Sequence, residues 1–89
     1  MRGSGLRVRV VLPEDLHARP AGRVAAAAPR FTSTVHIEYD GRTALAASVL
    51  AVMSLGARAG SAVHIVAEGP DAAAATSALT EILTGPGTS

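Results

Sequence analysis

The Asp40-Gly41 pair, near the middle of this 89-residue chain, most restricts how the sequence can fold. It follows residues 34–39, in which apolar and polar side chains alternate, and precedes a segment at about 42–46 that suits a short return strand. An Asp-Gly pair between two such segments is typical of a two-residue hairpin turn, because both central residues of that turn take positive φ. The sequence therefore predicts a β-hairpin within a mostly antiparallel sheet.

Two further segments have the pattern of strands. Residues 62–68 are rich in apolar residues and end at Gly69-Pro70, a pair that breaks regular structure. Residues 6–12 place every second side chain on one face, as in a half-buried strand. That face contains four apolar residues: Leu6, Val8, Val10 and Leu12.

Residues 18–28 and 72–83 each have the pattern of an amphipathic helix. The first contains Pro20 in its first turn, where a missing N–H costs little, and ends before Pro29. The second follows Asp71, which we expect to act as its N-cap. The apolar faces of these helices are predicted to pack on the sheet through Ala21, Val24, Ala25, Ala28, Ala72, Ala75, Leu79, Ile82 and Leu83.

Residues 49–55 indicate a short helix that begins after the N-cap residue Ser48. Its apolar residues do not keep to one stripe, and only Val52 and Leu55 suit the core. The others are predicted to form a docking surface for partner proteins, because methionine adapts to several contacts: Val49, Leu50 and Met53. A rotation of the helix that buries these three residues is the alternative.

The order of segments is strand, helix, strand, strand, helix, strand, helix. Since the helices must cover the apolar face of the sheet, the fold class is α+β, a two-layer open-faced sandwich. Eighty-nine residues suffice for one small domain. We assign this domain to residues 6–84, with residues 1–5 and 85–89 as disordered ends.

Composition excludes several classes of function. A net charge of +1 and only two aromatic residues, Phe31 and Tyr39, argue against nucleic-acid binding. The absence of cysteine excludes disulfides and thiolate metal sites, and His36 and His64, expected on the open face of the sheet, make a poor metal site alone. No cofactor is indicated. The sequence contains no run of about 18 apolar residues that could insert into a membrane, and the N-terminus lacks a secretory h-region, so we expect a cytoplasmic location. We also expect a monomer.

The best candidate site is Leu16-His17-Ala18-Arg19-Pro20-Ala21, at the start of the first predicted helix. Imidazole titrates near neutral pH, so His17 offers a nitrogen lone pair under physiological conditions. A helix start supplies free N–H groups and the positive end of the helix dipole. This combination suits a nucleophilic nitrogen that holds an anionic group such as phosphate. A histidine that merely caps the helix is the alternative.

This motif resembles the active-site signature of HPr, the histidine phosphocarrier of the bacterial phosphoenolpyruvate-dependent sugar phosphotransferase system. A second block, residues 48–56, is similar to the regulatory-serine helix of the same family, and the two blocks stand at the family's separation. The resemblance covers about Leu6 to Leu83. It implies a four-stranded antiparallel sheet in the order 1-4-2-3 with three helices on one face.

The resemblance also implies a role in which enzyme I passes a phosphoryl group to Nδ1 of His17, and His17 passes it to the sugar-specific A domains of permeases. The chain would then be a phosphoryl carrier with a phosphohistidine intermediate rather than a stand-alone enzyme. We expect the N–H groups of Ala18 and Arg19 and the Arg19 guanidinium to stabilise the bound group. Phosphoryl transfer of this kind needs positioning and charge, and no metal is implied.

Two residues leave the physiological role open. Ser48 matches a serine that a dedicated kinase phosphorylates in low-GC Gram-positive members, but it also suits a plain N-cap, and Ala47 stands where many regulated members carry lysine. Asp15 replaces the glycine usual two residues before the histidine and places negative charge near an anion site. The alternative is a related carrier or regulatory adapter that serves nitrogen control or dihydroxyacetone phosphorylation.

Overall fold

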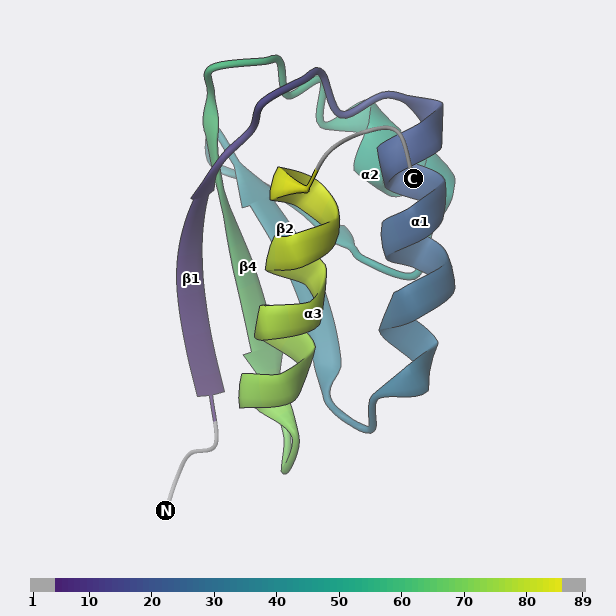
Figure 1. Ribbon diagram of the computed structural model, residues 1–89, viewed down its shortest axis with the longest axis vertical. Helices are drawn as coiled ribbons and strands as arrows, with labels where there is room; N and C mark the ends of the chain where they lie inside the picture. The colour runs from purple at the N-terminus through teal and green to yellow at the C-terminus, as the bar shows by residue number, and fades with distance from the viewer. Residues whose placement is uncertain (1–4, 86–89) are drawn as a thin grey trace.

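The computed structural model describes residues 5–85. Its elements, in chain order, are β1 (Gly5–Val11), α1 (Ala18–Ala27), the 3-10 turn η1 (Ala28–Arg30), β2 (Thr34–Tyr39), β3 (Arg42–Leu45), α2 (Val49–Ser54), β4 (Ala62–Glu68) and α3 (Ala72–Thr84). The four strands form one antiparallel sheet in the order β1-β4-β2-β3. Figure 1 shows α3 in front of the strands, with α1 and α2 beside α3. The predicted α+β sandwich and strand order are confirmed.

The hairpin between β2 and β3 forms at the predicted turn. Asp40 and Gly41 have φ angles of 51° and 77°, and Tyr39 pairs directly with Arg42. The return strand ends one residue before the predicted Ala46. That residue still donates its N–H to the carbonyl of Val35 at 2.9 Å, so the hairpin's hydrogen bonds continue past the strand.

The core lies between the sheet and the helices. Alternate residues of the central strands β2 and β4 point into it, and one large side chain of each helix meets them there. The largest fully buried side chains are Val24, Ile37, Val52, Val63, Ile65 and Leu79. On the opposite face, His36 and His64 are half-buried on neighbouring strands, as predicted, but they pair with Val66 and Glu38 rather than with each other.

Element boundaries differ from the sequence-based prediction by one residue in several places. Gly5 belongs to β1 and pairs with Glu68, although it was assigned to the N-terminal tail. The chain turns into η1 at Ala28, the position where the first helix was predicted to end. Leu55 follows α2 as its C-cap. Gly85, the first residue of the predicted C-terminal tail, is the C-cap of α3 and donates its N–H to the carbonyl of Glu81 at 2.8 Å. The predictions for residues 1–4 and 86–89 lie outside the described residues.

The prediction that the Asp71 side chain caps α3 is wrong. Asp71 occupies the N-cap position but makes no capping hydrogen bond. Its carboxylate instead accepts the N–H groups of Thr32, at 2.9 Å, and Ser33, at 2.8 Å, together with the Ser33 hydroxyl. These hydrogen bonds, the Ser33 hydroxyl first among them, lower the pKa of Asp71 to about 2. Asp71 therefore connects the β4–α3 turn to the segment before β2.

Glycine at position 69 is required by the same contact. Its φ is 146°, and a Cβ built there would lie 2.6 Å from the hydroxyl oxygen of Ser33. A side chain at this position would therefore separate the two segments that Asp71 joins.

Among residues 5–85, no helix is long and apolar enough to cross a bilayer.

Candidate functional site

His17 lies in the connection between β1 and α1, at the N-cap of α1. Its backbone is fixed, because its N–H donates to Asp15 at 2.9 Å and its carbonyl accepts the Ala21 N–H at 3.0 Å. Its neighbour Leu16 is buried in the core, whereas 54% of the His17 side chain is exposed. The ring makes no capping hydrogen bond, so the interpretation of His17 as a capping side chain is not supported.

Glu14 lies beside one nitrogen of the His17 ring. Its Oε1 atom is 3.7 Å from Nε2, which is close enough for an electrostatic contact but too long for a hydrogen bond. A carboxylate near Nε2 favours a proton on that nitrogen, and the neutral ring then keeps its lone pair on Nδ1. The geometry therefore distinguishes the two ring nitrogens.

The first turn of α1 leaves its leading N–H groups without a side-chain cap. Pro20 has no N–H, and the Ala21 N–H is used by the carbonyl of His17. The remaining donors at this helix start are Ala18 and Arg19, and no acidic residue lies in the first turn. The helix start thus offers an anion two N–H groups directly after the exposed imidazole.

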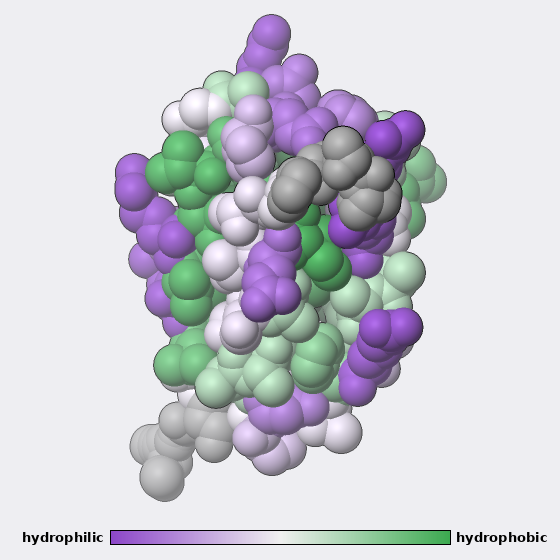
Figure 2. Space-filling view, in the orientation of Figure 1, coloured by the Kyte–Doolittle hydropathy of each residue, from purple (hydrophilic) through white to green (hydrophobic). Residues whose placement is uncertain are grey.

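The connection between α2 and β4 packs against the segment that carries His17. Leu16 donates its N–H to Ala57 at 2.9 Å, and the Asp15 carboxylate accepts the Ala59 N–H at 2.8 Å. Hydrophilic surface gathers at the upper end of Figure 2, where Figure 1 shows these two connections. Asp15, expected only as a negative charge near the site, therefore also holds a loop in place.

A shallow depression of about 290 Å³ lies at this contact. Its lining includes His17, Met53 from α2 and Arg58 from the α2–β4 connection. Arg19 does not line it. The Arg19 side chain borders a separate small hollow between α1 and the end of α3. The structure thus brings His17 together with one predicted docking residue and with an arginine that the motif did not indicate.

The α2 residues divide between the core and the surface. Val52 and Leu55 are buried as predicted, whereas Leu50 is 77% and Met53 37% exposed. Val49 is half-buried and packs against the core, so the alternative of a rotated helix holds for Val49 alone. Ser48 accepts the Ala51 N–H at 3.2 Å, which confirms its role as N-cap of α2.

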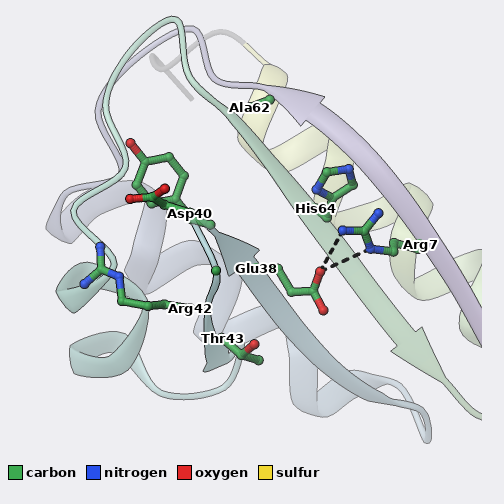
Figure 3. A pocket seen from close by; sticks show the side chains of 9 residues that line it. Arg7, Glu38, Asp40, Arg42, Thr43, Ala62 and His64 are labelled. Atoms are coloured by element: carbon green, nitrogen blue, oxygen red, sulfur yellow. Dashed lines mark hydrogen bonds and ion pairs between the residues drawn. The ribbon is translucent and has the colours of Figure 1, made fainter.

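A larger hollow, of about 400 Å³, lies on the open face of the sheet near the hairpin (Figure 3). Both of its arginines and Glu38 already have partners within the fold. Arg7 contacts Glu38 at 3.1 Å, and Arg42 donates to the carbonyls of Ser54 and Leu55 at the end of α2. Within residues 5–85, no group of three or more histidine, aspartate or glutamate side chains is placed to hold a metal ion. The exposed imidazole at the start of α1 is therefore the stronger candidate.

Comparison with known proteins shows the family of this chain. Residues 6–84 match the family model described as the phosphotransferase-system HPr component phosphorylation site. The chain belongs to the HPr family. It is 42% identical over 72 residues to the phosphocarrier protein HPr of Treponema pallidum, a match that covers 81% of this chain and 82% of that protein.

Solved HPr structures share the fold. A crystal structure of HPr from Bacillus anthracis superposes with a TM-score of 0.84 at 36% identity, covering 91% of this chain and 99% of that one. A structure described as an HPr dimer from Thermoanaerobacter tengcongensis has a TM-score of 0.70 at 39% identity and covers 75% and 77% of the two chains. The phosphocarrier assignment made from the two motif blocks is therefore confirmed at the level of the family.

Two residues of the site were not indicated by the motifs. Glu14 stands three positions before His17, a spacing that offered a usable signal. Arg58 is 41 positions away from His17 in the chain, and only the packing of two connections brings it to the same depression.

Proposed function

We propose that this HPr-family protein carries a phosphoryl group on His17, which it receives from phosphorylated enzyme I and passes to sugar-specific A domains. The observation that carries the proposal is the exposed His17 imidazole at the start of α1, whose nitrogens are not used to cap the helix. An exposed carrier residue suits a group that two different proteins must reach in turn.

In the first transfer, the Nδ1 lone pair of His17 attacks phosphorus. The bond between phosphorus and the donor breaks, and its electron pair stays with the donor. Glu14, 3.7 Å from Nε2, stabilises the positive charge that the ring acquires as the new bond forms. The second transfer is the reverse of this step, with a nucleophile of the A domain attacking the same phosphorus.

The charge of the bound phosphoryl group is stabilised by the helix start. The N–H groups of Ala18 and Arg19 are the donors left at this end of α1, and the Arg19 guanidinium adds a positive charge nearby. Both residues are exposed, so the interaction is screened by solvent. A carrier benefits from this moderate stabilisation, because a tightly enclosed group would not be released.

We assign partner docking to the exposed part of α2. Leu50 and Met53 present apolar surface on α2, and Met53 also lines the depression that contains His17. The half-buried Val49 is the third residue of this surface. Methionine can repack against different partners, which suits a surface used by both donor and acceptor. Phosphorylation of Ser48 would place charge at the start of α2 and would act through this docking surface, while disturbing the N-cap.

A monomer is the state we propose, because the exposed apolar surface of α2 is then free for donor and acceptor. Equilibrium sedimentation at assay concentration tests it, and a dimer that buries Leu50 would contradict it. The cytoplasm is the proposed location, because phosphoenolpyruvate, the original donor, is made there.

The decisive experiment incubates the protein with enzyme I and phosphoenolpyruvate labelled in its phosphoryl group. Label that is stable in alkali and labile in acid, lost in His17→Ala and kept in the control His64→Gln, supports the proposal. Absence of label, or label that survives in His17→Ala, contradicts it. If enzyme I fails while the phosphorylated donor of a nitrogen-control or dihydroxyacetone system succeeds, the related carrier is the correct assignment, and Asp15 is the residue that favours it.

A further inference from the structure

The α2–β4 connection is held rigidly beside His17. Gly56 and Gly60 shape it with positive φ angles of 69° and 86°. Besides the Leu16–Ala57 and Asp15–Ala59 hydrogen bonds, Gly60 donates to the carbonyl of Leu12 at 2.8 Å, and Leu12 donates to that of Ser61 at 2.9 Å. Four hydrogen bonds thus connect this loop to the segment before His17.

Arg58 lies in the middle of this loop, between the two glycines. Only its backbone is used within the fold, where its carbonyl accepts the Ser61 N–H at 2.9 Å. Its side chain is exposed and makes no hydrogen bond or ion pair with residues 5–85, whereas Arg7 and Arg42 are both engaged. The Arg58 guanidinium is therefore available to a ligand.

The depression at this contact places Arg58 and His17 along one surface. Arg19, the arginine of the motif, lines a different hollow. The nearby negative charges are Glu14, which lies at the Nε2 side of the ring, and Asp15, whose carboxylate is engaged by the Ala59 N–H. Arg58 thus supplies a positive charge to the depression that contains His17.

We propose that Arg58 binds the phosphoryl group carried by His17 and so acts as a second arginine of the carrier site. This inference deepens the proposed function and rests on it. A phosphoryl group carries up to two negative charges, and a guanidinium offers two parallel N–H donors to its oxygens. Arg58 and the helix start would then both contact the group.

The test uses phosphoramidate, a small donor that needs no partner protein. Its P–N bond breaks as the His17 nitrogen bonds to phosphorus, and the departing nitrogen takes a proton and leaves as ammonia. The chain has three histidines, so the variant His36→Gln/His64→Gln leaves His17 as the one phosphorylated imidazole. Phosphorus NMR then gives the pKa of the bound phosphoryl group.

Arg58→Ala is expected to raise that pKa by about 0.5 to 1, because a nearby positive charge favours the dianion. Arg58→Lys should recover most of the difference. Arg30→Ala is the matched control, since it removes the same charge from an exposed site in η1, at the other end of α1. A change in Arg58→Ala no larger than in Arg30→Ala overturns the proposal.

A second measurement requires no phosphorylated protein. Inorganic phosphate is titrated into the unmodified chain while the amide resonances of Ala18 and Arg19 are followed. We expect Arg58→Ala to weaken binding about threefold or more and Arg30→Ala to leave it within about twofold. If Arg58→Ala slows transfer from enzyme I but changes neither measurement, Arg58 contacts the partner protein and the proposal is wrong. Neither measurement uses enzyme I. If enzyme I proves not to be the phosphoryl donor, these measurements still test whether Arg58 binds the phosphoryl group.

Discussion

The carboxylate of Asp15 accepts the backbone N–H of Ala59 at 2.8 Å, across 44 positions of the chain. This bond joins the segment that leads into His17 to the loop that carries Arg58. An aspartate two residues before a phosphoryl-accepting histidine is unfavourable when only charge is considered. The structure shows that its charge is engaged by a backbone donor, so the residue orders the site as well as adding negative potential.

Asp15→Ala should therefore lower the free energy of unfolding by about 1 kcal/mol, the usual net contribution of such a hydrogen bond at an exposed site. Asp15→Asn keeps an acceptor oxygen and should cost less. Urea unfolding measures both values, and amide exchange at Ala59 gives a local readout. Equal protection of the Ala59 amide in Asp15→Ala and the parent chain would show that the bond does not hold the loop.

Leu50 provides the clearest test of the docking surface. Because 77% of its surface is exposed, Leu50→Ala should leave the unfolding midpoint nearly unchanged. If it contacts enzyme I, the same change should raise the KM for phosphorylated enzyme I about fivefold or more. Leu45→Ala is the matched control, because Leu45 is 46% exposed but belongs to β3. Similar KM values for the two variants would remove α2 from the interface.

Asp71 makes the stability of the fold depend on acid. Its pKa is about 2 in the folded chain, against an ordinary value of 3.8, so the folded state favours the ionised carboxylate. The stabilisation is complete above about pH 5 and is lost as the pH falls through 3.8 and then through the folded-state pKa of about 2. Thermal midpoints of the parent chain and Asp71→Asn should therefore differ at pH 7 and converge below about pH 2.

Ser33→Ala gives the companion measurement. The Ser33 hydroxyl is the largest cause of the lowered pKa of Asp71, so its removal should raise that pKa towards 3.8. Carboxyl carbon NMR follows the Asp71 titration directly. An unchanged Asp71 titration in Ser33→Ala would contradict the assignment of the cause.

The parts of the fold that follow from the sequence are those with a local cause. Asp40-Gly41 supplies its own turn geometry, alternation defines each strand face, and Val52 and Leu55 reach the core because they are one helical turn apart. Ser48 caps α2 because its donor lies three residues further on. In each case, a few neighbouring residues contain the whole interaction.

The features of the fold and of the site that could not be predicted from the sequence depend on contacts between segments that are distant in the chain. Asp71 has the local pattern of an N-cap. Its carboxylate instead accepts hydrogen bonds from the N–H groups of residues 32 and 33 and from the hydroxyl of residue 33. Arg58 reaches the site only through the packing of one connection on another. Val49 is half-buried because the core extends to the start of α2. The spacing of apolar residues in this short helix does not predict that contact.

Glu14 is predicted to set which nitrogen of His17 reacts. Its carboxylate lies 3.7 Å from Nε2, so it favours the neutral tautomer that leaves the lone pair on Nδ1. Glu14→Gln removes the charge while keeping the size of the side chain. An exposed contact of this kind contributes between a few tenths and about 1 kcal/mol. The ratio of the tautomer protonated on Nε2 to the tautomer protonated on Nδ1 should therefore fall by about two- to fivefold.

Nitrogen NMR of the His17 ring measures this ratio. The rate of phosphorylation by enzyme I should also fall, because Glu14 stabilises the positive charge that the ring acquires during transfer. Glu68→Gln is a suitable control, since Glu68 is an exposed carboxylate at the end of β4 that pairs with Gly5 and Thr34 rather than with the site. If Glu14→Gln and Glu68→Gln give the same ratio as the parent chain, another interaction selects Nδ1.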